Sequence, residues 1–475
     1  MKKILLLVVM GLCFANIKGQ INHYLSKDLN LLFIERGYSY IIPYTASAFD
    51  NAMSFHKKFW DYTPSEDVTI LLNDFSDVGN GGTLVIPWNY ISANIAPFEY
   101  TFDIMPANER LQWLMSHELA HVVMCDKASS IDKFYRSILG GKTIPEQENP
   151  VTMLYSYLTT PRWYSPRWYH EGIAVFMETW MSGGMGRVLG GYDEMVFRTM
   201  VLDSSYFYRV VGLESEGTTI DFQVGVNSYL YGTRFVSYLA NKYGVDKVRA
   251  FYNRTEDSKR FYASQFENVF NVDVEDEWET WIKFEKDFQN KNLELIRKYP
   301  ITKFKQITKN NLGSVSRPYY DKDTRSIVAA INYPKKLARI CKINIDNGEI
   351  TKITDVNSPN LYFVTNIAYD DSTKQVFFSE NNSDWRSLNV CDINGNNREE
   401  LIEYCRTGDF VINKADHTLW GVQTNNGRTM IVYAKPPYNE FNTVYAITFG
   451  TSIFDLDISA DGTKLSCTMS KVSGE

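Results

Sequence analysis

Two histidines four residues apart, with a glutamate directly after the first, are the residues of this chain best suited to chemistry. They are His117, Glu118 and His121, in a His-Glu-x-x-His motif. On a helix, positions i and i+4 lie one above the other, so both imidazoles can reach one metal ion at about 2.0–2.1 Å. The Glu118 carboxylate then lies beside the attacking water and can act as a general base. The motif predicts one catalytic Zn²⁺; an amphipathic helix that carries two histidines by chance is the alternative.

A third ligand is expected from a second helix at about residues 166–178. Ser165 is suited to cap this helix, and Pro166 is suited to its first position. Glu171 follows the first turn, where it can face the histidine pair. Two imidazoles, one carboxylate and one water make a four-coordinate catalytic zinc site. The alternative is that Glu171 is a surface residue favoured by the helix dipole.

Four stretches resemble the glutamate-zincin peptidases of the peptidase MA superfamily, specifically bacterial members fused to a Tol-type β-propeller. They follow the family's order, at residues 79–91, 114–121, 166–178 and 229–235. The resemblance implies a zincin-like fold in which His117, His121 and Glu171 hold zinc. It also implies that Glu118 takes a proton from water and later delivers it to the leaving amine.

Four further residues are expected near this metal. Through the resemblance, Tyr229 is the candidate donor to the oxyanion and Tyr231 the second candidate; alternatively, both are core aromatics. Glu178, two turns beyond Glu171, either orients a ligand histidine or is a solvated surface residue. His170 departs from the family pattern, and either intrudes on the metal, covers the site or is an uninvolved, partly buried histidine.

The beginning of the chain is typical of a secretory signal. Two lysines precede an apolar run from Ile4 to Phe14, and cleavage is expected near Gly19 and Gln20. The run is too short to span a membrane, and no later stretch is long enough. The expected location is therefore outside the cytoplasm of a bacterium: periplasmic, associated with the outer membrane, or extracellular. Five cysteines remain after the signal, and an odd, scattered set is not a disulfide framework.

The charge of the chain argues against nucleic acid as a partner. The formal net charge is −7, and removal of Lys2, Lys3 and Lys18 with the signal makes it −10. Such an acidic chain has no basic block that would follow a phosphate backbone.

The chain changes character near residue 300. Before it, strands at 68–73 and 83–86 are expected together with helices that dominate residues 108–297; after it, short strands alternate with polar turns. The strand that includes residues 83–86 either binds an extended substrate or is only a structural edge. We expect a signal at residues 1–20, an α+β zincin-like metallopeptidase domain at 21–300 and an all-β propeller at 301–475.

A repeat in the second part indicates the propeller. Asp323, Asp371, Asp416 and Asp461 follow one another at intervals of 48, 45 and 45 residues, which suits a four-stranded blade. These aspartates are interpreted as turn formers, with calcium loops as the alternative. About three and a half blades fit, whereas propellers close with about four to eight. The propeller is therefore expected to be incomplete, and the sequence to be the front part of a longer protein.

The sequence favours a secreted zinc peptidase that acts on a peptide or protein, with the propeller as a possible site for a protein partner. One alternative is a catalytically vestigial zincin that acts with the propeller as a protein-binding module in the cell envelope. Another is a structural surface protein without metal. The intact set of His117, Glu118, His121 and Glu171 favours catalysis.

Overall fold

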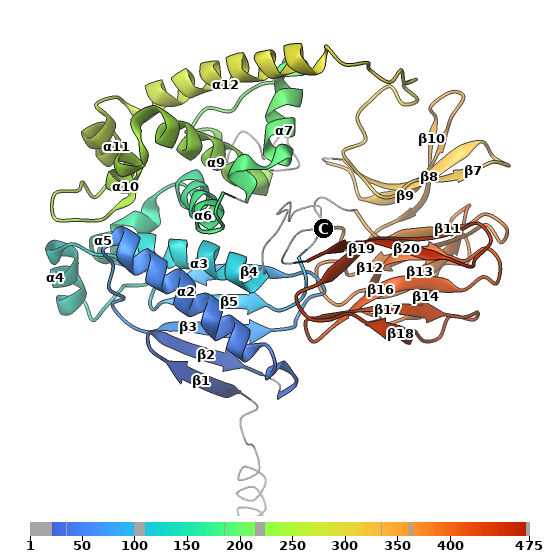
Figure 1. The fold of residues 1–475 in the computed structure, drawn as a ribbon, viewed down its shortest axis with the longest axis horizontal. Helices are drawn as coiled ribbons and strands as arrows, with labels where there is room; N and C mark the ends of the chain where they lie inside the picture. Colours follow the sequence, from blue (N-terminus) through green and yellow to red (C-terminus); the bar gives the residue numbers. More distant parts are fainter. Residues whose placement is uncertain are drawn as a thin grey trace, which may run out of the picture.

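The computed structural model describes residues 21–34, 36–98, 110–184, 186–213, 224–333, 335–360 and 364–471. The expected signal at residues 1–20 lies outside the described residues. A part dominated by helices comes first, and a part built from β-sheets follows (Figure 1). Helix α12 (Val274–Ile296) ends the first part, and the short strand β6 (Ser314–Val315) begins the second.

A five-stranded sheet lies at one side of the first part, in the order β1-β2-β3-β5-β4. Its strands are β1 (Asn22–Ser26), β2 (Leu29–Phe33), β3 (Val68–Asn73), β4 (Asn80–Leu84) and β5 (Tyr90–Asn94). Strands β2, β3 and β5 run parallel, whereas β1 and β4 are antiparallel to their neighbours. Strand β3 has the expected bounds. Strand β4 begins three residues before the expected 83–86, because its glycines, Gly81 and Gly82, carry no strand signal in the sequence.

Helices form the rest of the first part. They are α2 (Ile42–Trp60), α3 (Arg110–Asp126), α4 (Ser130–Ile138), α5 (Val151–Thr159), α6 (Arg167–Met181), α7 (Gly191–Leu202), α9 (Val224–Tyr243), α10 (Val245–Tyr252), α11 (Tyr262–Phe270) and α12, with 3₁₀ turns η1 (Arg36–Tyr38), η2 (Pro161–Tyr164) and η3 (Arg187–Leu189). Helix α3 packs against α2 and α6, and α6 packs against α9. The helix expected from residue 166 begins at Arg167, because Pro166 keeps an extended backbone.

Two glycines let α6 and α9 approach each other closely. A methyl group on Gly172 would lie 2.6 Å from the backbone carbon of Gly232, and one on Gly232 would lie 2.4 Å from the carbonyl oxygen of Trp168. Real side chains do not tolerate such distances. The crossing therefore requires glycine on both helices, directly beside Glu171.

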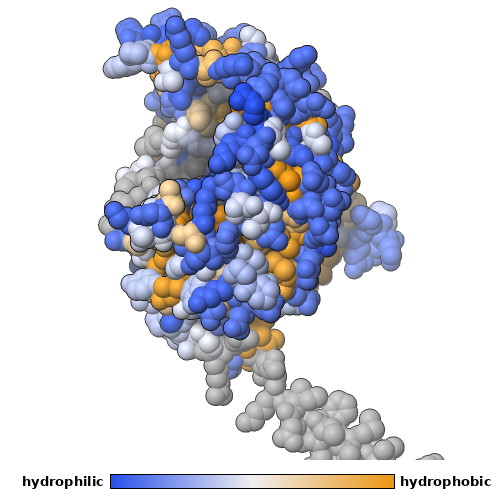
Figure 2. Space-filling model, turned by 90° about the vertical axis from the view of Figure 1, so that its right-hand side faces the viewer, coloured by the Kyte–Doolittle hydropathy of each residue, from blue (hydrophilic) through white to orange (hydrophobic). Residues whose placement is uncertain are grey.

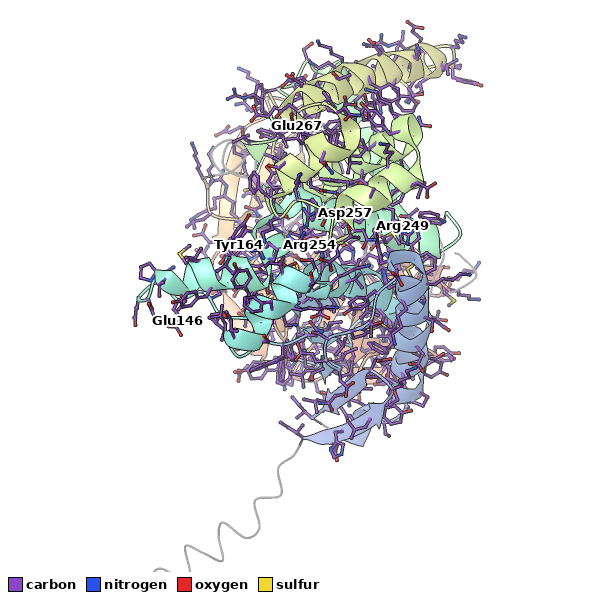
Figure 3. All side chains as sticks on the ribbon, turned by 90° about the vertical axis from the view of Figure 1, so that its left-hand side faces the viewer. Glu146, Tyr164, Arg249, Arg254, Asp257 and Glu267 are labelled. Carbon is purple, nitrogen blue, oxygen red and sulfur yellow. The ribbon has the colours of Figure 1, made fainter. Side chains whose placement is uncertain are left out.

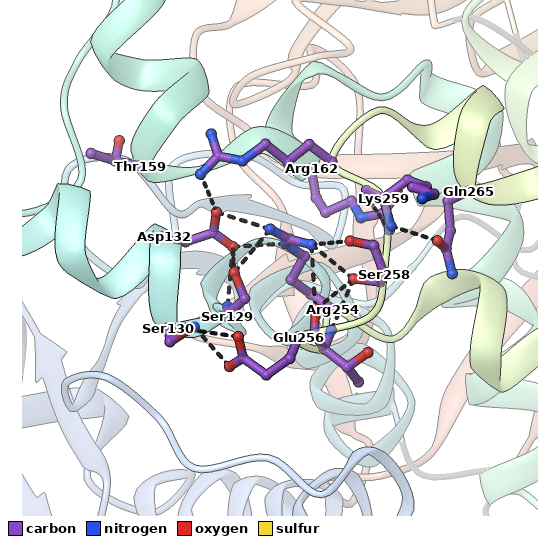
Figure 4. A network of polar contacts seen from close by, with 12 residues as sticks. Ser129, Ser130, Asp132, Thr159, Arg162, Arg254, Glu256, Ser258, Lys259 and Gln265 are labelled. Carbon is purple, nitrogen blue, oxygen red and sulfur yellow. Dashed lines mark hydrogen bonds and ion pairs between the residues drawn. The ribbon is translucent and has the colours of Figure 1, made fainter. Parts of the chain in front are cut away.

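A buried polar network ties α4 to the segment between α10 and α11, on the side of the molecule seen in Figure 3. Asp132 caps α4 together with Ser129, and it accepts hydrogen bonds from Arg254 at 2.7 and 3.0 Å (Figure 4). Arg260 donates to the same carboxylate at 2.8 Å. Nearby, Arg162 in η2 donates to the carbonyl of Lys259 at 3.0 Å, so the segment that leads into α6 is held too.

The second part consists of antiparallel sheets whose strands follow one another in sequence, as in propeller blades. The strands of the first sheet are β6, β7 (Tyr319–Asp321), β8 (Ser326–Asn332), β9 (Arg339–Asn344) and β10 (Ile350–Asp355); of the second, β11 (Ile367–Asp370), β12 (Gln375–Glu380), β13 (Ser387–Asp392) and β14 (Glu399–Ile402); of the third, β15 (Thr407–Ile412), β16 (Leu419–Asn425), β17 (Arg428–Ala434) and β18 (Asn442–Ala446); and of the fourth, β19 (Ser452–Ile458) and β20 (Leu465–Ser470). The prediction of propeller-like sheets after residue 300 is confirmed.

Aspartates recur in the turns that follow β7, β11, β15 and β19, one in each sheet. The Asp416 and Asp461 carboxylates accept hydrogen bonds from the backbone N–H two residues later, at 3.0 and 3.1 Å. In the first two sheets, Asp321 and Asp370 accept the corresponding bonds, rather than the expected Asp323 and Asp371. This is the turn-forming use of aspartate.

The outer face of the sheets is mainly hydrophilic, with small separate hydrophobic patches (Figure 2). Within the described ranges, no helix combines the length and the apolar character that crossing a membrane requires.

Candidate metal centre

Helices α3 and α6 bring together the three predicted ligands. His117 and His121 lie one turn apart on α3, and their Nε2 atoms are 3.2 Å apart. Glu171 comes from α6, and its Oε2 lies 3.4 Å from each of these nitrogens. Among the described residues, this is the cluster of His, Cys, Asp and Glu side chains whose ligand atoms meet closely enough to share a metal ion.

The spacing of these atoms fits a tetrahedral zinc ion. Bonds of about 2.0–2.1 Å at tetrahedral angles place neighbouring ligand atoms about 3.3 Å apart. The Oε2 atom of Glu171 is buried and has no hydrogen-bond partner of its own. Burial would raise the pKa of Glu171, but the neighbouring His121 and His117 side chains hold it well below its usual value. A cation at the centre of the three atoms would satisfy all of them.

Glu178 fixes the orientation of His117. This glutamate, two turns after Glu171, is fully buried, and its Oε2 lies 2.7 Å from His117 Nδ1. A carboxylate at this distance accepts a hydrogen bond from Nδ1–H, which leaves the Nε2 lone pair directed at the metal position. Burial alone would lower the pKa of His117, but the Glu178 and Glu171 carboxylates raise it well above its usual value.

Strand β4 holds the side chain of Glu118. Thr83 donates from its hydroxyl to Glu118 Oε2 at 2.7 Å and lies 3.2 Å from the Glu118 carbonyl oxygen. Gly81 lets the strand come this close, because a methyl group there would lie 2.7 Å from Glu118 Oε1. The next residue, Gly82, has open space on its side-chain face.

Tyr229 lies at the centre, as the resemblance implies for an oxyanion donor. Its ring stacks against that of His117 with 6.2 Å between the ring centroids, and its side chain lies close to the Glu171 carboxylate. Arg187, from η3, lies 5.7 Å from the same ring. Burial, together with the negative charges of Glu171 and Glu118, raises the pKa of Tyr229 well above its usual value. The phenol therefore keeps its proton and can donate it in a hydrogen bond.

The structure does not bring Tyr231 to the centre. Successive residues of a helix are rotated by about 100°, so residues two apart point to nearly opposite sides. Tyr231 is buried on the other side of α9, where its ring stacks on Trp278 at 6.1 Å and its hydroxyl accepts the backbone N–H of Tyr208 at 3.3 Å. It is a core aromatic residue, and its assignment as the second oxyanion candidate is wrong for this reason.

His170 lies beside the ligands rather than among them. The centroid of its ring is 6.3 Å from that of the His121 ring. Burial, together with the charge of His121, lowers the pKa of His170 to about 4. His170 is therefore a neutral part of the pocket wall near neutral pH.

A pocket of about 370 Å³ opens onto the centre. Its wall includes Gly82, Val85, Trp163 and Arg167 besides the residues described above. Cys125 also contributes to this wall, and burial raises the pKa of its thiol to about 12, so the thiol stays neutral. A volume of this size accommodates a few residues of a peptide.

The sequence interpretation missed three features of this centre. They are the hydroxyl of Thr83 on Glu118, the close glycine crossing of Gly172 and Gly232, and the cation of Arg187 near Tyr229. Thr83, Gly172 and Gly232 lie within the stretches that carry the resemblance, so the sequence pointed to these segments but not to the contacts that they make. Arg187 lies outside those stretches, and no sequence pattern pointed to it.

Comparison with protein-family models finds no match. Comparison with curated proteins also finds none. Among solved structures, a putative TolB from Agrobacterium tumefaciens is 11% identical, with a TM-score of 0.28 over 32% of this chain and 53% of that one. TolB from Acinetobacter baumannii is 13% identical, with a TM-score of 0.26 over 34% of this chain and 42% of that one.

A third similar structure is the β-propeller domain of the Trilobed protease from Pyrococcus furiosus. It is 14% identical, with a TM-score of 0.23 over 30% of this chain and 46% of that one. This chain thus spans about half the length of each of these three structures. At such scores the description of the second part as propeller-like rests on its own sheets.

Proposed function

We propose that this protein is an exported zinc-dependent peptidase with a zincin-like first part and a propeller-like second part. The observation that carries the proposal is the triangle of His117 Nε2, His121 Nε2 and Glu171 Oε2, with sides of 3.2–3.4 Å. These three atoms would hold the zinc. When bound, zinc lowers the pKa of water and polarises a carbonyl group.

The residues around the ligands suit peptide hydrolysis. Glu118, next to the triangle, would take the proton of the attacking water and deliver it to the leaving amine. Tyr229 would donate a hydrogen bond to the carbonyl oxygen as negative charge develops there. Strand β4 lines the pocket with Gly81, Gly82 and Thr83, so an extended peptide can lie alongside it.

Hydrolysis of a peptide library by the purified protein, with and without a zinc chelator, tests this proposal. We expect cleavage that the chelator abolishes and added zinc restores. Glu118→Gln keeps the shape of the side chain but accepts no proton, so turnover should fall at least about a hundredfold while zinc stays bound. Undiminished turnover in this variant would show that Glu118 is not the base. If no peptide is cleaved although zinc is bound, the protein-binding alternative is favoured.

A further inference from the structure

The loop between β3 and β4 is one of the places where the second part of the molecule contacts the first; Tyr40 and Arg110 make others, through hydrogen bonds to the carbonyls of Asn426 and Gly427. Two aspartates of this loop, Asp74 and Asp77, are buried against the propeller-like sheets. Arg406, between β14 and β15, donates two hydrogen bonds to the Asp74 carboxylate, at 2.7 and 2.8 Å. Its Nε donates a third, to Asp77 Oδ1, at 2.7 Å. One guanidinium thus bridges both carboxylates in the two-pronged geometry that gives strong, directional pairs.

Further bonds from the sheets complete this contact. The backbone N–H of Arg386 donates to Asp77 Oδ2 at 2.8 Å, and the N–H of Asn426 donates to Asp74 Oδ2 at 3.0 Å. Trp385 donates from its indole to the Asp74 carbonyl at 2.8 Å, and its ring lies 5.3 Å from the Arg406 guanidinium. Three separate loops of the second part, at residues 385–386, 406 and 426, therefore hydrogen bond with one loop of the first.

The β3–β4 loop leads directly into β4, the strand that contacts the proposed general base Glu118. Only three residues separate Asp77 from Gly81, whose backbone lies against the Glu118 carboxylate. Thr83, two residues further on, donates the hydrogen bond to Glu118 Oε2. The contact with the sheets and the contact with Glu118 thus belong to one short segment of the chain.

Strand β4 is an edge strand that is held along its length by β5 and α3, and the contact with the second part lies just before its first residue. It stands last in the sheet order and pairs with β5 alone. Two of its five residues are glycines, which weaken a strand through their greater conformational freedom. The contact just before its first residue therefore adds to the restraints that fix its position.

We propose that Arg406 is a positioning residue for the active site, through which the propeller-like part sets the position of β4. This inference rests on the proposed function, because it assigns β4 the roles of holding Glu118 and of receiving the substrate. Loss of Arg406 would leave two buried carboxylates without their shared cation. The loop would then move toward water, and β4 would lose this restraint while the zinc ligands on α3 and α6 remain in place.

Hydrogen–deuterium exchange on the whole protein tests this inference independently of activity. In Arg406→Met, we expect amides of residues 79–84 to exchange at least about tenfold faster, with α3 and α6 unchanged. Arg398→Met is the matched control. Arg398 also pairs with a carboxylate, Glu380, at 2.6 Å and lies 5.5 Å from an aromatic ring, but these contacts stay within the second part. Exchange in 79–84 that is unchanged in Arg406→Met, or equally raised in Arg398→Met, would overturn the inference.

Kinetics supply the second readout. For an extended peptide substrate, Arg406→Met should lower kcat/KM about tenfold, mainly by raising KM, with the zinc content unchanged. Arg406→Lys should recover part of this loss, because lysine restores the positive charge but not the two-pronged hydrogen bonding of the guanidinium. If Arg406→Met does not fold, Asp77→Asn tests the same contact from the other side and should give the same exchange pattern. A wild type without zinc would refute the proposed function, but the exchange comparison would still decide this inference.

Discussion

Each reactive side chain of the proposed centre is fixed by a neighbour that does not itself act on substrate. Glu178 accepts a hydrogen bond from the Nδ1–H of His117 at 2.7 Å, and Thr83 donates a hydrogen bond to Glu118 at the same distance. Both contacts are made from elements that are distant in sequence from α3. Such supporting contacts account for much of the affinity of a metal site and of the alignment of a base.

The two tyrosines of α9 allow a residue of the pocket, Tyr229, to be compared directly with a residue of the core, Tyr231. Tyr229→Phe removes only the hydroxyl at the pocket, so we expect turnover to fall about ten- to a thousandfold with little change in stability. Tyr231→Phe removes a buried hydroxyl from the core, so it should leave turnover unchanged and lower the unfolding free energy by about 1 kcal/mol. Steady-state kinetics and urea unfolding of both variants check this. Equal, small effects on turnover would contradict the assignment of Tyr229.

The crossing of α6 and α9 is the contact between elements on which the centre depends most. Gly172→Ala places a methyl group 2.6 Å from the Gly232 backbone, so the helices must separate. We expect a loss of about 1–3 kcal/mol in unfolding free energy, together with weaker zinc binding because Glu171 moves with α6. Gly82→Ala is the control, since its methyl group meets no atom within 4 Å. Equal stability of the two variants in urea would contradict this account of the crossing.

The end of α3 is held by a buried carboxylate. Asp126 accepts hydrogen bonds from Tyr62 at 2.7 Å and from Lys142 at 3.1 Å. Burial would raise the pKa of Asp126, but Lys142 and Ser65 hold it down at about 2, below the usual 3.8. A depressed pKa means that the charged form stabilises the fold. This contribution is fully present above about pH 4 and is lost as the pH falls through about 2.

Asp126→Asn makes that contribution measurable. At pH 5 the variant should be less stable than the wild type, by on the order of 2 kcal/mol, and the difference should shrink as the pH falls toward 2. Urea unfolding at a series of pH values, with a chelator present so that zinc release does not contribute, gives both curves. A difference that is constant over this pH range would show that the charge of Asp126 does not stabilise the end of α3.

Local patterns could be placed from the residues alone, whereas the more distant Glu171 and Tyr229 were joined to the histidines mainly through the resemblance. The helical spacing of His117 and His121 and the repeated aspartate turns are local patterns, and the structure has an α3 helix and propeller-like sheets at these places. The contact of Arg406 with Asp74 and Asp77 joins residues more than 300 positions apart and leaves no periodic signal. Thr83 lies in a stretch that carries the resemblance, but its contact with Glu118, 35 residues away, leaves no pattern in the sequence.

In the whole molecule, the two parts are joined by the β3–β4 loop and by further contacts of Tyr40 and Arg110 with the sheets, so they do not stand as independent units. The sheets grip the chain just before β4, and β4 lines the pocket beside the proposed zinc ligands. We therefore propose that the propeller-like part contributes to the geometry of the centre.

Zinc content of the whole protein tests the central claim most directly. After loading with zinc and removal of the excess, elemental analysis should give about one zinc per chain for the wild type. His121→Ala removes one corner of the triangle and should lose the metal, whereas His170→Ala, which changes a neighbouring histidine outside the triangle, should keep it. A wild type without zinc, or an His121→Ala variant with full occupancy, would contradict the assignment of this centre.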